Sequence, residues 1–285
     1  MREKLQDYEG EIHMRLILEL HANGNFSRFE FERKYRTAIH GLCHNFFSES
    51  IFPAVKNIHD SKDPGLFCFS GLSGKFGERG EIVSSEKYKL TLSSPVGPIF
   101  FTLATQFKQI FMSKKKIEIG DMQFQLEGIN EFKPNLTKND IVFSDGPIIL
   151  TKSSEGKKQF VLSKGSEINK NNIIDPQLFI ALFRSNLSTK AKQLGLTIVD
   201  KLDQIPNPEV VTITKKGRTI ETLTTQMQIK PNSEDYYVVG NRIRIAVPFS
   251  EPSEIAEFEK LMDCGFGVMN GYGFGFMKKS IGTWE

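Results

Sequence analysis

Histidines are the residues of this chain best suited to acid–base chemistry near neutral pH, and all five fall within its first 59 residues. Histidine has an ordinary pKa close to neutrality, so it can both take and return a proton during a reaction. The five are His13, His21, His40, His44 and His59. Their distribution directs the search for a reactive site to the N-terminal part of the chain.

Two of these histidines, His40 and His44, stand four residues apart and would share one face of a helix. A pair with this spacing can bind zinc, but Gly41 replaces the glutamate of the H-E-x-x-H motif. We therefore expect no metal site. The run His59-Asp60-Ser61 is a single H-x-S motif, whereas two-histidine phosphoesterases need two such motifs.

The stretch from Cys264 to Lys279 is the most unusual in composition. Glycine is entropically costly, so a cluster indicates positive φ angles or close approach of a ligand to the backbone, and phosphate is a common ligand of such N–H groups. The Walker and dinucleotide-binding patterns are both absent. A phosphate-binding loop and a glycine-rich hairpin packed on a sheet remain open. The glycines, with the basic pair that follows them, are Gly265, Gly267, Gly271, Gly273, Gly275, Lys278 and Lys279.

Composition indicates a globular protein with one large domain or two ordinary ones: 285 residues, 39% hydrophobic and 25% charged. No apolar run is long enough to span a membrane, and the N-terminus has no apolar signal core, so we expect a cytoplasmic protein. Three cysteines without C-x-x-C spacing indicate neither a disulfide framework nor a zinc ribbon.

Net charge is only +3, but the cations are clustered, which suits local contacts with a phosphate backbone. A turn containing Lys215, Lys216 and Arg218 is one such cluster, and we expect it, together with Lys278 and Lys279, to contact phosphates of a nucleic-acid backbone.

The first half of the chain predicts the order β-α-β-β-α-β of a ferredoxin-like unit. Residues 1–13 form a polar extension before it. The predicted elements are His13 to His21, Phe31 to Ser50, Phe67 to Phe69, Tyr88 to Ser93, Gly97 to Met112, and a hairpin or long strand over Ile117 to Phe132.

The second half repeats this order more loosely after a linker near Pro134 to Ser144. Ser253 is the candidate N-cap of the last helix. The predicted strands are Gln159 to Leu162, Thr197 to Val199, Val210 to Thr214, Thr219 to Lys230, Arg242 to Val247 and Tyr272 to Met277; the helices are Pro176 to Leu194 and Ser253 to Met262. We predict an α+β fold of tandem ferredoxin-like (RRM-like, βαββαβ) domains at 14–135 and 145–285.

The glycine spacing near the C-terminus resembles that of the CRISPR repeat-cleaving endoribonucleases of the RAMP superfamily. A second motif agrees: His59-Asp-Ser-Lys62-Asp-Pro64-Gly-Leu66-Phe67-Cys-Phe69-Ser70 is similar to the family's His-x-x-x-Lys-x-Pro-x-Leu-Phe-x-Phe-Ser. This chain departs at Gly65, where relatives can carry a catalytic lysine, and at Val268 and Met269, where they often carry Glu-Lys.

The resemblance implies tandem ferredoxin-like domains and metal-independent cleavage of repeat RNA, giving a 2′,3′-cyclic phosphate and a 5′-OH. It implies His44 and His59 as the acid–base pair and Lys62 as the cation near the developing charge. His40 is expected to pack or to contact RNA. No cofactor is implied.

Repeat RNA is the expected partner, and CRISPR effector subunits and a second copy of the chain remain open as further partners. One rival function is a non-catalytic RAMP subunit that holds RNA in an effector complex. Another is a metal-dependent nuclease or phosphotransferase, which would need a carboxylate cluster that the sequence does not show.

Overall fold

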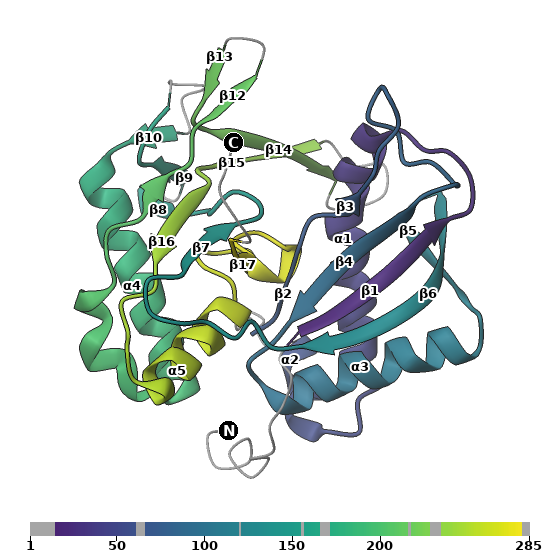
Figure 1. Cartoon of the computed structure of the whole chain (residues 1–285), viewed down its shortest axis with the longest axis horizontal. Helices are drawn as coiled ribbons and strands as arrows, with labels where there is room; N and C mark the ends of the chain where they lie inside the picture. The colour runs from purple at the N-terminus through teal and green to yellow at the C-terminus, as the bar shows by residue number, and fades with distance from the viewer. Residues whose placement is uncertain are drawn as a thin grey trace. The chain divides into compact units, whose positions relative to one another are not determined.

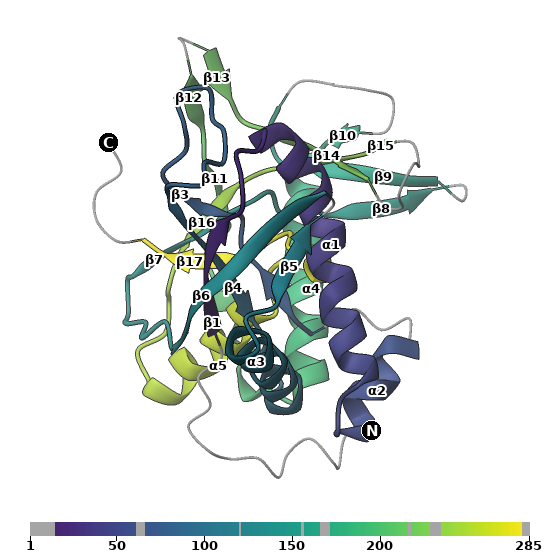
Figure 2. The same ribbon diagram turned by 90° about the vertical axis from the view of Figure 1, so that its right-hand side faces the viewer.

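A computed structural model describes residues 15–60, 66–119, 121–154, 157–165, 172–215, 218–228 and 235–280. Its chain divides into two compact units (Figures 1 and 2). The N-terminal unit contains the described parts of Met1–Lys133, Thr225–Tyr237 and Gly271–Gly273. The C-terminal unit contains those of Pro134–Thr224, Val238–Asn270 and Phe274–Glu285. Each unit is therefore discontinuous in sequence.

The N-terminal unit is an antiparallel sheet with helices on one face (Figure 2). Its strand order is β2-β4-β1-β6-β5, and β3 also pairs with β4. If β2 and β3 are taken together, this is the second-third-first-fourth order of a ferredoxin-like unit, with β5 added at one edge. The elements are β1 (Arg15–Ala22), α1 (Arg28–Ser48), α2 (Pro53–Asp60), β2 (Cys68–Phe69), β3 (Ser73–Gly74), β4 (Lys87–Ser93), α3 (Gly97–Met112), β5 (Lys116–Ile119) and β6 (Met122–Phe132).

The alternation of side chains along β1 explains how this sheet meets its helices. Leu16, Leu18 and Leu20 are at most 1% exposed, because every second residue of a strand faces the same side. Opposite them in the register of β4 stand Leu92, Leu90 and Tyr88, which are also buried.

The C-terminal unit repeats the same topology. Its four-stranded sheet has the order β11-β16-β7-β17, all antiparallel, and the elements follow one another as β7-α4-β11-β16-α5-β17. Two insertions interrupt it: β8, β9 and β10 before α4, and two hairpins between β11 and β16. The predicted α+β class with tandem ferredoxin-like domains is confirmed. The bounds are β7 (Ile141–Ser144), β8 (Thr151–Ser154), β9 (Lys157–Leu162), β10 (Asn172–Ile174), α4 (Pro176–Leu194), η2 (Thr197–Gln204), β11 (Glu209–Val210), β12 (Ile213–Lys215), β13 (Arg218–Ile220), β14 (Leu223–Gln228), β15 (Asp235–Gly240), β16 (Ile243–Ala246), α5 (Pro252–Asp263), η3 (Asn270–Tyr272) and β17 (Met277–Lys279).

Helix α4 has both ends fixed by its sequence. The Asp175 side chain accepts a hydrogen bond from the Leu178 N–H at 2.9 Å, and Pro176 occupies the first turn, where its missing N–H costs nothing. Gly195 ends the helix in the left-handed conformation with φ +67°. The predicted bounds, Pro176 to Leu194, are confirmed.

Several other predictions for the C-terminal half are wrong. Ile141–Ser144, assigned to the linker, is β7, the first strand of the second sheet, so Gln159 to Leu162 belongs to an insertion. Thr197 to Val199 lies in the 3-10 helix η2. Tyr272 to Met277 is not a strand, because η3 ends at Tyr272 and β17 begins at Met277.

The predicted cap of α5 is also wrong. Glu251 is the N-cap residue and makes no side-chain capping bond, while Ser253 already lies inside the helix.

Residues 1–13 lie outside the described part of the chain. Among the described residues, no helix combines the length and apolar character needed to cross a membrane.

Candidate active site

One face of α1 in the N-terminal unit carries Arg36, His40 and His44 at intervals of four residues. Residues so spaced on a helix lie one above the other. An adjoining face holds the helix in the core through Tyr35, Ile39 and other buried side chains. The sequence of α1 therefore places the imidazoles of His40 and His44 next to each other, one helical turn apart.

The imidazole of His40 is held by the tip of the glycine-rich loop, Gly271–Gly273, which belongs to the same unit. Its Nδ1 lies 2.9 Å from the carbonyl oxygen of Gly271. A carbonyl oxygen only accepts, so Nδ1 donates this bond and the neutral ring keeps its lone pair on Nε2. Burial lowers the pKa of His40 below its usual value, although the bond to Gly271 opposes the shift. His40 is therefore suited to act as a neutral base.

The ring of His44 lies next to that of His40, one helical turn away on α1. The two ring centroids are 4.2 Å apart with an interplanar angle of 53°. Phe47 and Phe67 contact the His44 ring edge-on, with centroids at 5.6 and 6.2 Å. Two imidazoles this close can divide the work of proton removal and proton donation.

The glycine-rich loop needs its glycines for backbone conformation. Gly265, Gly267, Gly273 and Gly275 all have φ between +71° and +81°, a region that side chains disfavour. A Cβ on Gly267 would lie 2.6 Å from the Ile149 carbonyl oxygen. The expected positive φ angles are thus present, but at Gly267 and Gly275 the adjacent space is filled by the protein's own backbone.

Three glycine N–H groups of this loop donate hydrogen bonds within the protein. Those of Gly265 and Gly275 donate to the carbonyls of Met262 and Pro147 at 2.9 and 3.2 Å. That of Gly267 donates to the Asn186 side chain at 3.0 Å. Binding of phosphate by the loop backbone stays a prediction.

A buried lysine, Lys190 of α4, holds the first part of the loop. Its ammonium, on a residue only 5% exposed, donates to the carbonyl oxygens of Gly265 at 2.5 Å and Gly267 at 3.0 Å, and to Asn270 Oδ1. Asn270 in turn donates through Nδ2 to Phe266 and Phe274 carbonyls at 3.1 and 2.7 Å. The three oxygen acceptors thus offset the cost of burying the Lys190 charge, and the ammonium in turn supplies these buried oxygens with hydrogen-bond donors.

Replacing this lysine should loosen the loop. Lys190→Met fills similar volume but leaves three buried oxygens without a donor, so we expect the free energy of unfolding to fall by about 1–3 kcal/mol. Lys192→Met is the matched control, because Lys192 is exposed on the same helix. Chemical denaturation of both variants checks this, and equal stability of the two would contradict the structural role of Lys190.

Two of the cations predicted to bind RNA already form ion pairs within the protein. Lys278 lies 2.7 Å from Asp145 and Lys279 lies 2.8 Å from Asp140, both pairs within the C-terminal unit. Burial alone would raise the pKa of Asp140, but hydrogen bonds from Lys279 and Thr137 lower it overall. Both lysines are therefore already paired with carboxylates.

The other predicted residues are only partly described. Lys215 and Arg218 are backbone register partners in the β12–β13 ladder. His59 falls in α2, a helix that the sequence did not predict, and its side chain is not described. Lys62 and Lys216 lie outside the described residues.

Sequence reasoning missed four residues that build this region: Arg36, Lys190, Asn270 and Tyr272. Tyr272 stacks on His40, with centroids 3.9 Å apart and planes at 20°. The available signal in the sequence was its position between Gly271 and Gly273, because small flanking residues leave an aromatic side chain room to pack against a neighbouring element.

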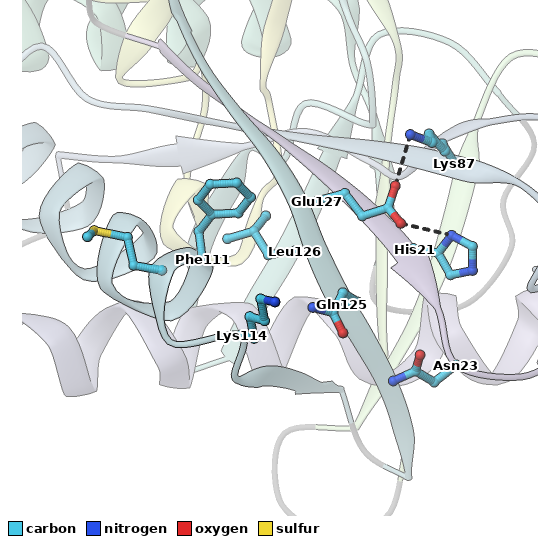
Figure 3. Close-up of a pocket in the computed structure, with 9 residues that line it drawn as sticks. His21, Asn23, Lys87, Phe111, Lys114, Gln125, Leu126 and Glu127 are labelled. Atoms are coloured by element: carbon cyan, nitrogen blue, oxygen red, sulfur yellow. Dashed lines mark ion pairs between the residues drawn. The ribbon is translucent and has the colours of Figure 1, made fainter.

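A second group of polar residues lines an open pocket elsewhere in the N-terminal unit (Figure 3). There the carboxylate of Glu127 lies 3.3 Å from His21 Nδ1 and 2.9 Å from Lys87 Nζ. The hydrogen bond to Glu127 raises the pKa of Lys87. These ion pairs join β6 to β1 and β4, which gives His21 a structural role.

Potential metal ligands are sparse in the described residues, where no three His, Cys, Asp or Glu side chains form a group able to hold an ion. All three cysteines are buried and none forms a disulfide. Burial raises the pKa of the Cys43 thiol and raises that of the Cys264 thiol to about 12, so both thiols are protonated at neutral pH.

The paired ferredoxin-like units described above are a fold that this chain shares with solved CRISPR-associated proteins. Among solved structures, the product of a Cas6-related gene from Pyrococcus furiosus matches with a TM-score of 0.61 at 21% identity, covering 94% of this chain and 98% of that one. A CRISPR-associated protein Cas6 matches with a TM-score of 0.58 at 20% identity, covering 94% and 99%. At these identities the matches establish the fold.

Sequence comparison adds a full-length relative. The chain is 24% identical over 277 residues to CRISPR-associated endoribonuclease Cas6 2 of Methanocaldococcus jannaschii, covering 93% of this chain and 98% of that protein. No family model matches the chain. The resemblance to CRISPR-associated repeat-RNA endoribonucleases of the RAMP superfamily, indicated by the sequence motifs, is confirmed.

Proposed function

We propose that this protein is a metal-independent endoribonuclease that cleaves CRISPR repeat RNA in the cytoplasm. The observation that carries the proposal is the His40–His44 pair, whose rings lie 4.2 Å apart beside the glycine-rich loop. Full-length similarity to a protein named as a CRISPR-associated endoribonuclease supports the substrate class.

The chemistry asks little of the protein because RNA carries its own nucleophile. His40 Nε2 takes the proton of the ribose 2′-OH, and the 2′-oxygen attacks the adjacent phosphorus. As the bond from phosphorus to the 5′-oxygen breaks, His44 as imidazolium donates the proton that this oxygen needs. The products are a 2′,3′-cyclic phosphate and a 5′-OH, and no atom or electron comes from another reagent.

His59 and Lys62 keep the roles that the family motif gives them. In that assignment His59 shares the acid–base work with His44, and Lys62 stabilises the charge that develops on the phosphorane. His40 and His59 are thus alternative partners for His44, and alanine variants of each distinguish them.

Binding of the RNA is assigned to the glycine-rich loop and to the basic turns. Gly271 and Gly273 bring backbone close to the histidine pair, while Lys215, Lys216 and Arg218 would contact phosphates from the β12–β13 turn. Lys278 and Lys279 can contribute only by dividing their hydrogen bonds between their carboxylate partners and the RNA phosphates. One structure with the same fold, at a TM-score of 0.59 and 19% identity, is titled as a RAMP protein binding different RNA substrates.

A non-catalytic RNA-holding subunit of a CRISPR effector complex is the alternative function. It would need the same fold and basic turns, but it has no use for adjacent imidazoles with one ring nitrogen fixed as a donor. The histidine pair therefore favours the enzyme.

Cleavage of the cognate repeat RNA is expected to persist in excess EDTA and to give one discrete product end. A repeat with 2′-deoxyribose before the scissile phosphate should remain intact, because the nucleophile is missing. Gel analysis of both substrates, with and without EDTA, checks this. Activity that is lost in EDTA and restored by magnesium would contradict the mechanism, and no cleavage in any condition would favour the RNA-holding subunit.

A further inference from the structure

The tip of the glycine-rich loop contacts His40 through two kinds of interaction at once. The Gly271 carbonyl accepts from Nδ1 at 2.9 Å, and the Tyr272 ring lies over the imidazole with centroids 3.9 Å apart. The hydrogen bond fixes which nitrogen carries the proton, and the stacked ring fixes the plane in which the other nitrogen points. Together they define the direction of the His40 Nε2 lone pair.

Arg36 holds this loop tip in place from the same helix that carries His40. Its Nη1 donates to the carbonyl oxygens of Tyr272, at 3.0 Å, and Gly273, at 2.7 Å. Arg36 is 4% exposed, and its guanidinium packs on the ring of Tyr35 at 4.9 Å. One turn of α1 thus separates the group that anchors the loop from the group that the loop orients.

Glycine is required at the tip for this close approach. A Cβ on Gly271 would lie 3.4 Å from His40 Nδ1, at the limit of ordinary contact. A Cβ on Gly273, where φ is +73°, would lie 2.5 Å from the Phe69 ring. These glycines let the backbone approach His40 of α1 and Phe69 of β2, a purpose distinct from admitting a phosphate.

We infer that the loop tip Gly271–Gly273 is a positioning device for His40, with Tyr272 as the positioning residue and Arg36 as its anchor. The inference rests on the proposed function, since it gives His40 a defined tautomer and direction for proton transfer to Nε2. It assigns to the loop a role toward the protein's own base, in addition to any contact with RNA.

The groups around His40 favour a neutral ring. His44 faces it at 4.2 Å, and a charge on one imidazole disfavours a charge on the other. Arg36, one turn away on α1, is a fixed cation. Burial raises the pKa of Tyr272, so its phenol stays uncharged and shields the imidazole from water without adding a counter-charge.

The test compares Tyr272→Ala with Tyr272→Phe, the matched control that keeps the ring. ¹⁵N NMR of the histidine side chains reports the tautomer and pKa of His40 without reference to activity. In wild type and Tyr272→Phe, we expect Nδ1 to carry the proton and the pKa of His40 to lie below the ordinary value for histidine. In Tyr272→Ala, the exposed ring should show mixed tautomers and a pKa closer to that ordinary value.

Cleavage should follow the NMR change. At saturating protein, Tyr272→Ala should cut about 10-fold more slowly, and the acidic limb of its pH–rate profile should move to higher pH, because a base with a higher pKa is protonated over more of the range. RNA affinity should stay within a few-fold.

Three outcomes would overturn the inference. An unchanged His40 tautomer and pKa in Tyr272→Ala would do so whatever happens to cleavage. Weaker RNA binding with an unaltered pH profile would show that Tyr272 stacks on a base. An altered His40 signal with cleavage at the wild-type rate would contradict the function proposed for His40, and positioning for catalysis with it.

Discussion

His40→Ala and His44→Ala are each expected to slow single-turnover cleavage by roughly 10²–10⁴-fold, the usual contribution of a general base or acid. RNA affinity should change only a few-fold, since the lost interaction serves the transition state more than the bound substrate. The double variant should be little slower than the slower single variant, because residues that act as a unit are not additive. Rapid-quench assays at saturating protein measure these rates.

His21→Ala is the matched control, since it removes an imidazole that pairs with Glu127 in the pocket of Figure 3. Its cleavage rate should equal that of wild type. If His40→Ala cleaves normally while His59→Ala does not, the acid–base pair is His44 with His59, as the family motif implies. Normal rates in His40→Ala, His44→Ala and His59→Ala would exclude a histidine mechanism.

Gly275→Ala is expected to be among the most destabilising small substitutions in the chain, costing about 3 kcal/mol or more. A Cβ there would lie 1.8 Å from the Phe266 carbonyl oxygen, at a residue with φ +71°. Phe266 cannot easily yield, because it is fully buried and its N–H donates back to the Gly275 carbonyl at 2.9 Å. Its ring also contacts those of Phe183 and Phe258.

Gly195→Ala measures the cost of a positive φ alone, without a steric collision of the added Cβ. Gly195 has nearly the same φ, +67°, but nothing lies within 4 Å of its added Cβ. We expect this variant to lose about 1 kcal/mol, the cost of a left-handed alanine alone. Urea denaturation of the pair gives the difference, and equal losses would mean that the Gly275 backbone moves away without cost.

Regular elements with long periodic patterns were predictable from the sequence. Helix α4 agrees to the residue, because Pro176 and Gly195 mark its ends and the apolar spacing fills the interval. The β-α-β-β-α-β order of the first half is confirmed for the same reason. Strand β7 was missed because it has only four residues and follows Asn135 and Asn139, which both have positive φ and read as loop.

The geometry around His40 could not be predicted, because its partners are distant in sequence. His40 and Gly271 are 231 residues apart, and no periodicity links them. Sequence analysis assigned His40 only to packing or to a contact with RNA, since neither Tyr272 nor Arg36 belongs to a motif. Lys190 was missed for the same reason: a buried lysine is rare, and only the loop carbonyls around it make its burial tolerable.

The grouping of Gly271–Gly273 with the N-terminal unit has a consequence for biosynthesis. Domains of a nascent chain generally fold in the order in which they emerge from the ribosome. Here the strands and helices up to Lys133 are translated early, but the carbonyl that fixes His40 and the ring that covers it are added only after residue 270. The first unit to be made therefore waits for residues of the last part of the chain, and His40 lacks its Gly271 and Tyr272 contacts on a ribosome-bound chain until those residues have been synthesised.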